Sequence, residues 1–311
     1  MKLQKTETQS ELRVERLHIV KRYSLILDKN LCRGCGICKV VCPKDAVEIV
    51  KIPKSFEGEK AKRPIIEVNE NKCVFCGICD AICPFGALTL KVDGEHVIPV
   101  VRSESFPQII HNLEIDTTKC EVGCSDCEKA CPLGIIKARK MSPLERAREI
   151  VKSKKGNVKL RPLIDVQLSS CPGCGLCELA CPQKAIKTRK IFYGNIAINH
   201  DKCPSGCQDC LTVCPFPGVL SLSDDGKVSV NARHCTYCGI CELVCPVESA
   251  LMLHRTYVNH SSVHSGAWNK ALERLTDTNV LARELKTLSA LRTQKLVSKR
   301  LVGRSHKSGK K

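Results

Sequence analysis

Large aromatic side chains are scarce in this sequence of 311 residues, which contains 6 Phe, 4 Tyr and 1 Trp. Such side chains normally supply much of the apolar area of a protein core. We therefore expect something other than aromatic packing to fill or crosslink the interior. The length alone predicts about two domains.

Long apolar runs are also missing. No stretch approaches the roughly 20 apolar residues that a membrane-spanning helix requires, so we expect no membrane span. Residues 1–10 are polar and lack the apolar centre of a secretory signal, so we expect a cytoplasmic protein. Because the cytosol keeps thiols reduced, we do not expect the 24 cysteines to form disulfides.

Common catalytic and nucleotide-binding motifs are absent as well. The sequence has no P-loop, no G-x-G-x-x-G pattern and no H-E-x-x-H pattern. The nine histidines show no metal-ligand spacing, so we expect them at the surface or in packing. We therefore expect no catalytic site in this chain.

The cysteines are present in a strict pattern. All 24 fall into six runs of four, numbered here in chain order, and each run ends in Cys-Pro. Runs one, two, four and six have the spacing C-x2-C-x2-C-x3-C-P; they are Cys32, Cys35, Cys38, Cys42; Cys73, Cys76, Cys79, Cys83; Cys171, Cys174, Cys177, Cys181; and Cys235, Cys238, Cys241, Cys245. Runs three and five have one more residue in the first gap; they are Cys120, Cys124, Cys127, Cys131 and Cys203, Cys207, Cys210, Cys214.

This spacing is the bacterial ferredoxin signature for [4Fe–4S] clusters, in which the fourth Cys of a run ligates the other cluster of a pair. Structural zinc needs only four ligands per site and does not require this run six times. We therefore predict six [4Fe–4S] clusters. A glycine follows the second Cys in the four C-x2-C runs, where positive φ lets backbone N–H groups approach the sulfurs; these are Gly36, Gly77, Gly175 and Gly239.

The segments around the runs repeat as strand, cluster loop, short helix and strand. Short apolar stretches follow four runs, at 46–49, 87–90, 185–187 and 250–253, and others precede runs, at 23–27, 64–68 and 163–167. The residues Gly194-Asn195 and Asp224-Asp225-Gly226 are typical of hairpin turns. This pattern predicts an α+β fold.

Runs three and four resemble runs five and six as a duplicated unit, because runs three and five share Lys, Gly, Asp and every Cys. We expect three tandem ferredoxin-like dicluster modules with a C-terminal helical extension. The expected boundaries are 1–22 for an N-terminal extension, 23–101, 102–190 and 191–255 for the modules, and 256–311 for a basic helical segment. A helical insertion is expected near 141–159. A nested arrangement, in which one module interrupts another, stays open.

Tandem pairing predicts six ligand sets, each numbered by the run that supplies its first three cysteines. Sets one and two are Cys32, Cys35, Cys38, Cys83 and Cys73, Cys76, Cys79, Cys42. Sets three and four are Cys120, Cys124, Cys127, Cys181 and Cys171, Cys174, Cys177, Cys131. Sets five and six are Cys203, Cys207, Cys210, Cys245 and Cys235, Cys238, Cys241, Cys214.

The formal net charge of +18 would by itself favour nucleic acid or another anionic surface as a partner. Six oxidised clusters with their thiolates would contribute about −12, which leaves about +6. The basic excess is thus explained by buried cluster charge, and no nucleic-acid-binding motif is present, so we expect no nucleic-acid partner.

Two further features are expected to matter. Phe75 and Tyr237 lie at equivalent positions just before a second Cys, where each is expected to pack on its cluster and limit water. In the C-terminal segment, 266–277 and 279–302 are predicted helices. The second helix carries an apolar stripe of Leu281, Leu285, Leu288 and Leu296 that we expect to pack on a partner subunit, or else on the chain's own modules.

Taken together, the paired runs and the basic end containing Gly-Ala-Trp268-Asn-Lys-Ala-Leu-Glu resemble polyferredoxins over residues 23–255. The chain looks most like the polyferredoxin subunit of formylmethanofuran dehydrogenases from methanogenic archaea. This resemblance implies relay of low-potential electrons to or from a molybdenum or tungsten subunit that reduces carbon dioxide to a formyl group. The implied partners are catalytic and other electron-transfer subunits of a large redox complex, with a soluble ferredoxin as a further partner.

Two alternatives stay open. The chain could be the iron–sulfur subunit of another redox complex, such as a hydrogenase, formate dehydrogenase or heterodisulfide reductase assembly, and co-purified subunits would separate these. It could also have a non-redox role in iron storage or as a scaffold, which clusters that cannot be reduced reversibly would favour.

Overall fold

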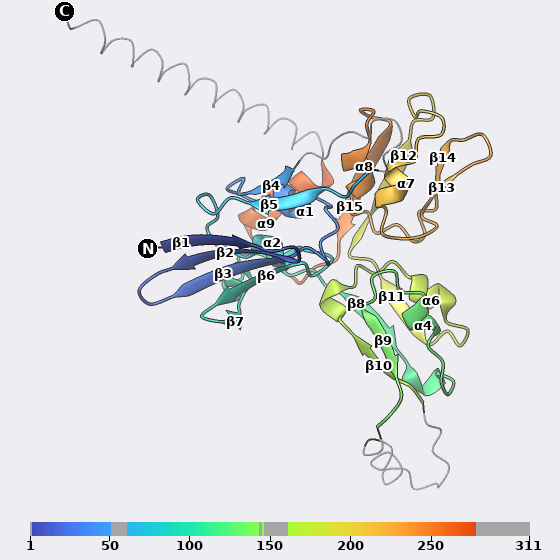
Figure 1. Ribbon diagram of the computed structural model, residues 1–311, viewed down its shortest axis with the longest axis horizontal. Coiled ribbons are helices and arrows are strands. Elements are labelled where there is room, and N and C mark those ends of the chain that lie inside the picture. Colours follow the sequence, from blue (N-terminus) through green and yellow to red (C-terminus); the bar gives the residue numbers. More distant parts are fainter. Residues whose placement is uncertain (1, 51–60, 143–144, 146–160, 278–311) are drawn as a thin grey trace, which may run out of the picture.

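The computed structural model describes residues 2–50, 61–142, 145 and 161–277 (Figure 1). Its strands are β1 (Lys2–Glu7), β2 (Glu11–Leu17), β3 (Arg22–Asp28), β4 (Val47–Val50), β5 (Ile65–Val68), β6 (Leu88–Val92), β7 (Glu95–His96), β8 (Asn112–Ile115), β9 (Ile136–Arg139), β10 (Leu163–Val166), β11 (Ile186–Arg189), β12 (Phe192–Ile198), β13 (Leu220–Leu222), β14 (Val228–Val230) and β15 (Leu251–Val258). Its helices are α1 (Ile37–Val41), α2 (Ile78–Ala81), α3 (Pro99–Arg102), α4 (Asp126–Lys129), α6 (Leu176–Ala180), α7 (Asp209–Val213), α8 (Ile240–Val244) and α9 (Gly266–Thr276), with 3-10 turns η1 (Thr117–Lys119) and η2 (Leu168–Ser170).

One rule of strand pairing occurs three times along the chain. The strand before the first run of a pair lies antiparallel to the strand after the second run, as in β3 with β6, β8 with β11, and β12 with β15. The two strands between the runs pair with each other, as in β4 with β5, β9 with β10, and β13 with β14. We call residues 2–96, 112–189 and 192–258 the first, second and third strand groups.

The three strand groups occupy different parts of the molecule (Figure 1). The first group, in blue and cyan, extends to one side, the second group points down, and the third group lies above it. In the first group, β1 and β2 enlarge the pair β3–β6 to a five-stranded sheet with the order β1-β2-β3-β6-β7. The sequence analysis placed residues 1–22 in an extension and did not predict these strands.

Each run has one short helix between its second and fourth cysteines. Each helix begins directly after the residue that follows the second cysteine, and in four runs that residue is the expected glycine. Four of them have a left-handed N-cap glycine, with φ of 73° at Gly36, 85° at Gly77, 75° at Gly175 and 89° at Gly239. The expected positive φ at these glycines is therefore confirmed. Each helix is only four or five residues long, so tertiary contacts rather than intrinsic propensity must hold it in place.

A repeated carboxylate supplies one such contact. In four runs an acidic residue directly follows the third Cys and accepts a hydrogen bond from a backbone N–H of the strand after the run. The bonds are Leu90 N to Asp80 (2.7 Å), Ala138 N to Glu128 (3.0 Å), Thr188 N to Glu178 (2.9 Å) and Leu253 N to Glu242 (3.1 Å). Each carboxylate thereby fixes a short helix to the strand that follows it.

Most expected strands are present within a residue or two of their predicted ends. The predicted turn at Asp224-Asp225-Gly226 is confirmed, because it joins β13 to β14. The predicted turn at Gly194-Asn195 is wrong: both residues lie inside β12. A side chain at 194 would meet the His254 carbonyl oxygen at 2.1 Å, so this glycine allows close strand approach rather than a turn.

The C-terminal part of the described chain returns to the first strand group, where α9 packs against α1. The predicted helix at 266–277 is confirmed as α9. Its Trp268 packs edge-on against Phe106 at a centroid distance of 5.2 Å, and its N-cap Ser265 donates to the Ser105 carbonyl at 2.6 Å. The predicted helix at 279–302 lies outside the described residues, as does most of the predicted insertion at 141–159.

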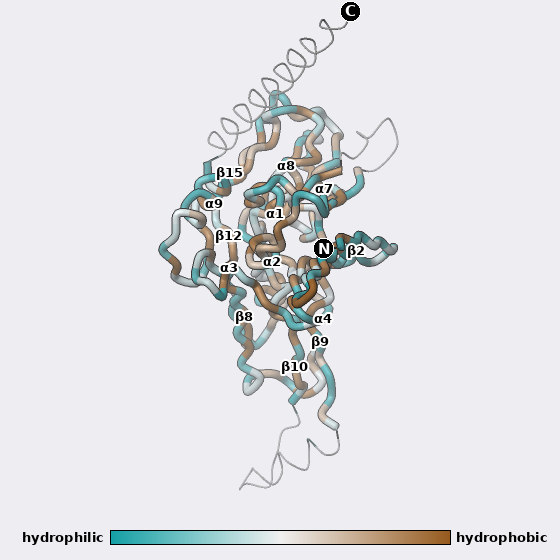
Figure 2. The backbone as a smooth tube through the Cα atoms, turned by 90° about the vertical axis from the view of Figure 1, so that its left-hand side faces the viewer, coloured by the Kyte–Doolittle hydropathy of each residue, from teal (hydrophilic) through white to brown (hydrophobic). Residues whose placement is uncertain are grey.

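Cysteines and aliphatic side chains fill the interior together. Each of the three buried apolar clusters contains cysteines from the runs, which agrees with the expectation that aromatic packing alone does not form the core. In Figure 2 the apolar segments, in brown, gather around α2 near the middle of the molecule. Within the described residues no helix is both long and apolar enough to cross a membrane.

Candidate metal centres

Three of the predicted cysteine sets each line one small apolar cavity. All four cysteines of set one line a cavity with Leu27 and Ile66. Those of set two line another with Leu25 and Val68, and those of set five a third with Ile198. In each cavity the fourth cysteine comes from the other run of the pair, as crossed pairing within a strand group requires.

In each of the other three sets, thiols from both runs of the pair lie near enough to act on one another's pKa. Burial raises the pKa of Cys120, and the thiols of Cys181 and Cys124 raise it further. In set four, burial and the neighbouring thiols, Cys131 among them, raise the pKa of Cys174 to about 11 and that of Cys177 to about 12. In set six, burial and then Cys238, Cys235 and Cys214 raise the pKa of Cys241.

A positive φ directly before the second cysteine shapes every run. The six residues are Gly34 (72°), Phe75 (54°), Gly123 (80°), Gly173 (76°), Gly206 (77°) and Tyr237 (53°). This conformation turns backbone N–H groups toward sulfur, as at Tyr237 N, which lies 3.4 Å from Cys235 Sγ. Fourth cysteines accept similar bonds, each of 3.3 Å, from Ala46 N, Ala87 N and Ala185 N.

At two of these positions a neighbouring segment leaves no room for a side chain. A Cβ at Gly34 would lie 2.2 Å from the Pro64 carbonyl oxygen, and one at Gly173 would lie 2.1 Å from the Arg189 carbonyl oxygen. Phe75 and Tyr237 have room for their rings and are 3% and 7% exposed. The expectation that these two rings shield the cysteine loops from water therefore agrees with their burial.

The chemistry of these sites fits [4Fe–4S] clusters. Burial raises the pKa of Cys38 and Cys79 well above the ordinary thiol value, so in the absence of a metal these thiols stay protonated. Bound iron deprotonates coordinating thiols, and backbone N–H groups aimed at the sulfurs stabilise the thiolates that result. No three His, Cys, Asp or Glu side chains of the described residues are arranged around a single ion. A four-iron cluster holds its thiolates farther apart than a single ion does. The wider spacing of the thiols within each cysteine set is therefore compatible with clusters.

Cations and histidines that the sequence analysis did not select contact the cysteine loops. Arg16 donates to the Cys73 carbonyl at 2.6 Å, and its guanidinium lies over the Phe75 ring. Lys190 lies over the ring of Tyr237 in the same manner, at 5.1 Å from its centroid. Arg16 and Lys190 are far in sequence from the loops that they cover, so spacing within a run gives no signal for them.

Two histidines bind backbone carbonyls in the loop of run four, in the second strand group. His111 Nδ1 lies 2.8 Å from the Cys171 carbonyl oxygen, and His234 Nδ1 lies 2.9 Å from that of Cys174. The sequence analysis expected the histidines at the surface or in packing, and these two pack against the loop of run four, with His234 buried. The position of His234 next to Cys235 was the only local signal.

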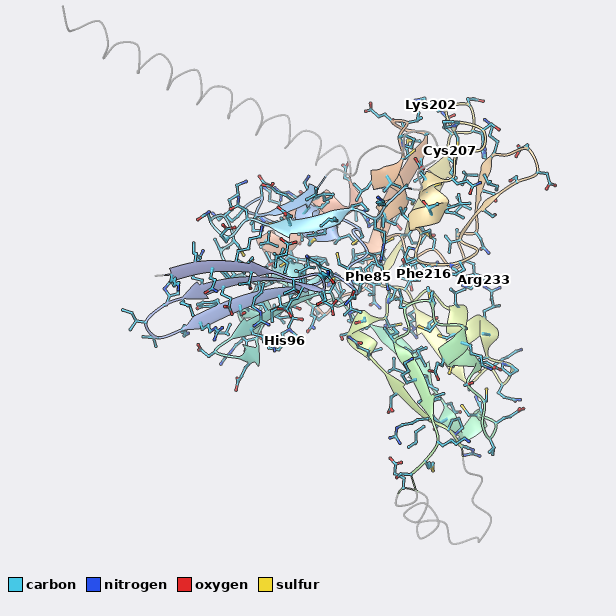
Figure 3. The ribbon with its side chains drawn as sticks, in the orientation of Figure 1. Phe85, His96, Lys202, Cys207, Phe216 and Arg233 are labelled. Carbon is cyan, nitrogen blue, oxygen red and sulfur yellow. The ribbon has the colours of Figure 1, made fainter. Side chains whose placement is uncertain are left out.

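Sets one and six meet at the centre of the molecule. The thiol of Cys238 contributes to raising the pKa of Cys35, after burial, so the two lie close together. Phe85 and Phe216, which follow the Cys-Pro of runs two and five, stack with ring centroids 6.5 Å apart near the middle of the molecule (Figure 3). Arg255 donates to the carbonyls of Tyr237 and Cys238, both at 2.8 Å, and its charge acts on the thiols of both sets.

Set four joins the same region. His234 connects the loop of run four to the first cysteine of run six. Burial lowers the pKa of Lys190, while the thiols of Cys235 and Cys174 act to raise it. A Cβ at Gly86 would lie 2.7 Å from the Ser169 carbonyl, so the loop after run two also reaches the start of run four. Sets one, four and six, one from each strand group, are therefore neighbours.

The 4Fe-4S dicluster domain matches the chain in four stretches. Different models of this domain match residues 31–87 and 170–219, residues 195–246, and residues 119–185. The matches together include all six runs. The stretch 170–219 spans runs four and five, whereas strand pairing places run five with run six.

Known proteins of similar sequence are iron–sulfur proteins. An uncharacterised ferredoxin of Methanocaldococcus jannaschii is 36% identical over 52 residues, which is 16% of this chain and 82% of that protein. A ferredoxin of Methanothermococcus thermolithotrophicus is 32% identical over 56 residues, 18% of this chain and 92% of that protein. The isethionate sulfite-lyase activating enzyme of Desulfovibrio desulfuricans is 38% identical over 60 residues, but the match spans 18% of this chain and only 19% of that enzyme.

A solved structure matches nearly the whole chain. It is a chain of the formate dehydrogenase–heterodisulfide reductase–formylmethanofuran dehydrogenase complex from Methanospirillum hungatei, with 30% identity and a TM-score of 0.73. The match covers 88% of this chain and 91% of that chain. Together with the ferredoxins matched over most of their length, it shows that this chain belongs to the family of 4Fe-4S dicluster ferredoxins, which are iron–sulfur proteins of electron transfer.

Proposed function

We propose that this protein is a polyferredoxin that carries six [4Fe–4S] clusters, one held by each of sets one to six. The observation that carries the proposal is the repeated grouping of three cysteines from one run with the fourth cysteine of its partner run. The proposal assigns all 24 cysteines of the sequence to sets of this kind, and none is left over.

The clusters would lie in three tandem dicluster modules, residues 23–101, 102–190 and 191–255. The threefold repetition of the strand-pairing rule supports this division. A nested arrangement would instead pair strands of different groups. The basic C-terminal segment at 256–311 would lie outside the modules, whereas residues 1–22 would enlarge the sheet of the first module through β1 and β2.

The residues of this chain would bind the clusters, keep water away from them and influence their reduction potentials. They would not react themselves. A bound [4Fe–4S] cluster supplies reversible one-electron oxidation and reduction at low potential. The cysteines hold it, backbone N–H groups such as Tyr237 N stabilise the thiolates, and buried side chains such as Phe75 exclude water. No described residue requires a catalytic role in this function.

The partners would be catalytic and electron-transfer subunits of a large redox complex in the cytoplasm. The match to a chain of the Methanospirillum hungatei complex favours an assembly that contains formylmethanofuran dehydrogenase. The same match keeps a heterodisulfide reductase or formate dehydrogenase assembly as the second candidate, since that complex contains all three. Purification from the native organism with identification of the bound subunits distinguishes them.

Iron and sulfide analysis under anaerobic conditions tests the cluster content. We expect about 24 iron and 24 sulfide per chain, with reversible reduction followed by electron paramagnetic resonance. Zinc without sulfide, or clusters that cannot be reduced reversibly, would overturn the proposal. Cys42→Ala tests the crossed ligation: it should alter the cluster of Cys73, Cys76 and Cys79 and spare that of Cys32, Cys35 and Cys38.

A further inference from the structure

A basic groove lies where the second and third strand groups meet. Its volume is about 640 Å³, and it is lined by the loop of run four, by β11 and by the residues just before run six. Figure 3 labels Arg233 at this junction, between the two groups. The groove is much larger than the cysteine-lined cavities and opens to solvent beside them.

The charge of the groove is strongly one-sided. Its cations are Lys184, Lys187, Arg189, Lys190 and Arg233, and its single carboxylate is Glu178. That carboxylate accepts hydrogen bonds from the backbone and hydroxyl of Thr188, so it is already engaged. In the described part of the chain, none of these five cations forms an ion pair with an Asp or Glu.

Cysteines of two different sets lie in the wall of the groove. Cys174 belongs to set four and Cys181 to set three, and both line it. Lys190 also lines the groove, and its ammonium lies over the ring of Tyr237, which stands in the sequence between the first two cysteines of run six. A molecule seated there would approach two cysteine sets directly.

Exposed apolar side chains border the same surface. Leu179 is 58% exposed and Tyr193 is 38% exposed, and both line the groove. Tyr193 packs beside Tyr257, which is 54% exposed, at a centroid distance of 5.8 Å. Exposed apolar and aromatic groups within a charged surface are typical of protein contacts.

We propose that this groove is the docking surface for an acidic electron-carrier protein. Unpaired cations steer and orient an acidic surface, the exposed Leu179 and Tyr193 give contact area, and Cys174 and Cys181 bring two cysteine sets within its reach. The inference rests on the proposed function. The exchange is a one-electron transfer in which the carrier is oxidised and the holoprotein reduced, with no bond made or broken.

Nucleic acid would also be attracted by these cations. It would have no reason to approach the cysteines, and the groove offers only Tyr193 as an aromatic surface for base stacking. An acidic redox protein accounts for both the charge and the position of the groove.

The test uses the full-length holoprotein and a reduced, acidic two-cluster ferredoxin as the probe. The double variant Lys187→Glu with Arg233→Glu reverses one charge on each wall. It should slow oxidation of the ferredoxin about tenfold or more at low salt, and high salt should abolish the difference. The matched control, Lys2→Glu with Lys21→Glu, changes the net charge equally in the first strand group and should change the rate less than twofold.

Three results would overturn the docking proposal. They are an unchanged rate in the groove variant, an equal loss in the control, and an equal loss in Lys202→Glu, which tests the surface beside set five (Figure 3). Tighter binding of a single-stranded oligonucleotide than of the ferredoxin, lost in the groove variant, would assign the groove to nucleic acid instead. If the Glu variant does not assemble, Lys187→Gln with Arg233→Gln should still slow the reaction severalfold.

The proposed function is judged on the unaltered protein. Its iron content and its extent of reduction by excess dithionite are measured before any variant is compared. An unaltered protein without reducible clusters contradicts the proposed function, whereas a reducible protein with a groove-independent rate contradicts only the docking surface.

Discussion

At the residue scale, Arg255 is a positive charge shared by two cysteine sets. Its guanidinium donates to the Tyr237 and Cys238 carbonyls, and it also acts on Cys35 of the first strand group. A cation favours the more negative, reduced state of a neighbouring cluster. Sets one and six should therefore be easier to reduce than an environment without this charge would allow.

Replacing Arg255 with Gln should lower the reduction potentials of the clusters in sets one and six. A charge interaction of about 1–2 kcal/mol corresponds to roughly 40–90 mV for one electron. Arg255→Lys keeps the charge and should shift the potentials less. Redox titration followed by electron paramagnetic resonance measures both, with iron content checked first. Equal shifts in the two variants would contradict a role of the charge.

Glycine at the position before the second cysteine gives a second prediction. Gly173→Ala should lose the cluster of set four, because its Cβ would meet the Arg189 carbonyl oxygen at 2.1 Å. Gly123→Ala is the matched control, since its φ is equally positive but no atom lies within 4 Å. The control should cost only the ~1–2 kcal/mol of a left-handed non-glycine residue. Iron content measures the difference, and equal losses would show that space is not decisive.

At the element scale, the short helices depend on the carboxylate that follows the third cysteine. Asp80, Glu128, Glu178 and Glu242 each accept a backbone N–H from a following strand. Runs one and five have Lys39 and Leu211 at this position instead. Their helices α1 and α7 are held without this bond.

Glu128→Ala should speed cluster loss from the second strand group. Removal of the acceptor leaves the Ala138 N–H without its protein partner and removes the bond that joins α4 to β9. Lys39→Ala, at the equivalent position of run one, should have little effect. The rate of absorbance bleaching on mild heating compares them. A greater loss with Lys39→Ala would indicate that burial and not the carboxylate holds these helices.

Local patterns predicted the elements that they encode directly. The cysteine spacing, the N-cap glycines and the apolar stretches placed the loops, helices and most inner strands. Contacts between distant segments left no local signal, as with Arg16 over Phe75 or Arg255 on run six. The predicted turn at Gly194 was wrong because a glycine that allows close strand approach and a glycine in a turn cannot be told apart in the sequence without the partner strand.

At the scale of the whole molecule, α9 connects the C-terminal part of the chain to the first strand group. Trp268 is 2% exposed and lies between Phe106 and His260, at centroid distances of 5.2 and 4.6 Å. The segment before α9 also bonds to 108–110, where Ser261 N donates to the Gln108 carbonyl. These contacts join segments that are about half the chain apart.

Trp268→Ala should loosen this connection and leave the clusters in place. Truncation of a buried Trp costs roughly 3–5 kcal/mol, but the ring contacts of Trp268 are with Phe106 and His260 and not with a cysteine loop. Limited proteolysis should cut more rapidly near 258–277, while iron content stays unchanged. Tyr257→Ala, at an exposed aromatic residue, serves as the control. Loss of iron in Trp268→Ala would show that the helix supports a cysteine set.

The meeting of sets one, four and six changes how damage would spread. In a linear series of carriers, one broken carrier separates everything on its two sides. Here each outer set, two, three or five, is paired by its crossed cysteines with one of the central three. Oxidative loss of the cluster in an outer set would disable only the outer end of its own strand group. Electron transfer between the other two strand groups would continue. Loss of set six, which touches both of the others, would disconnect far more, and that is the set most deeply enclosed by Arg255, Lys190 and His234.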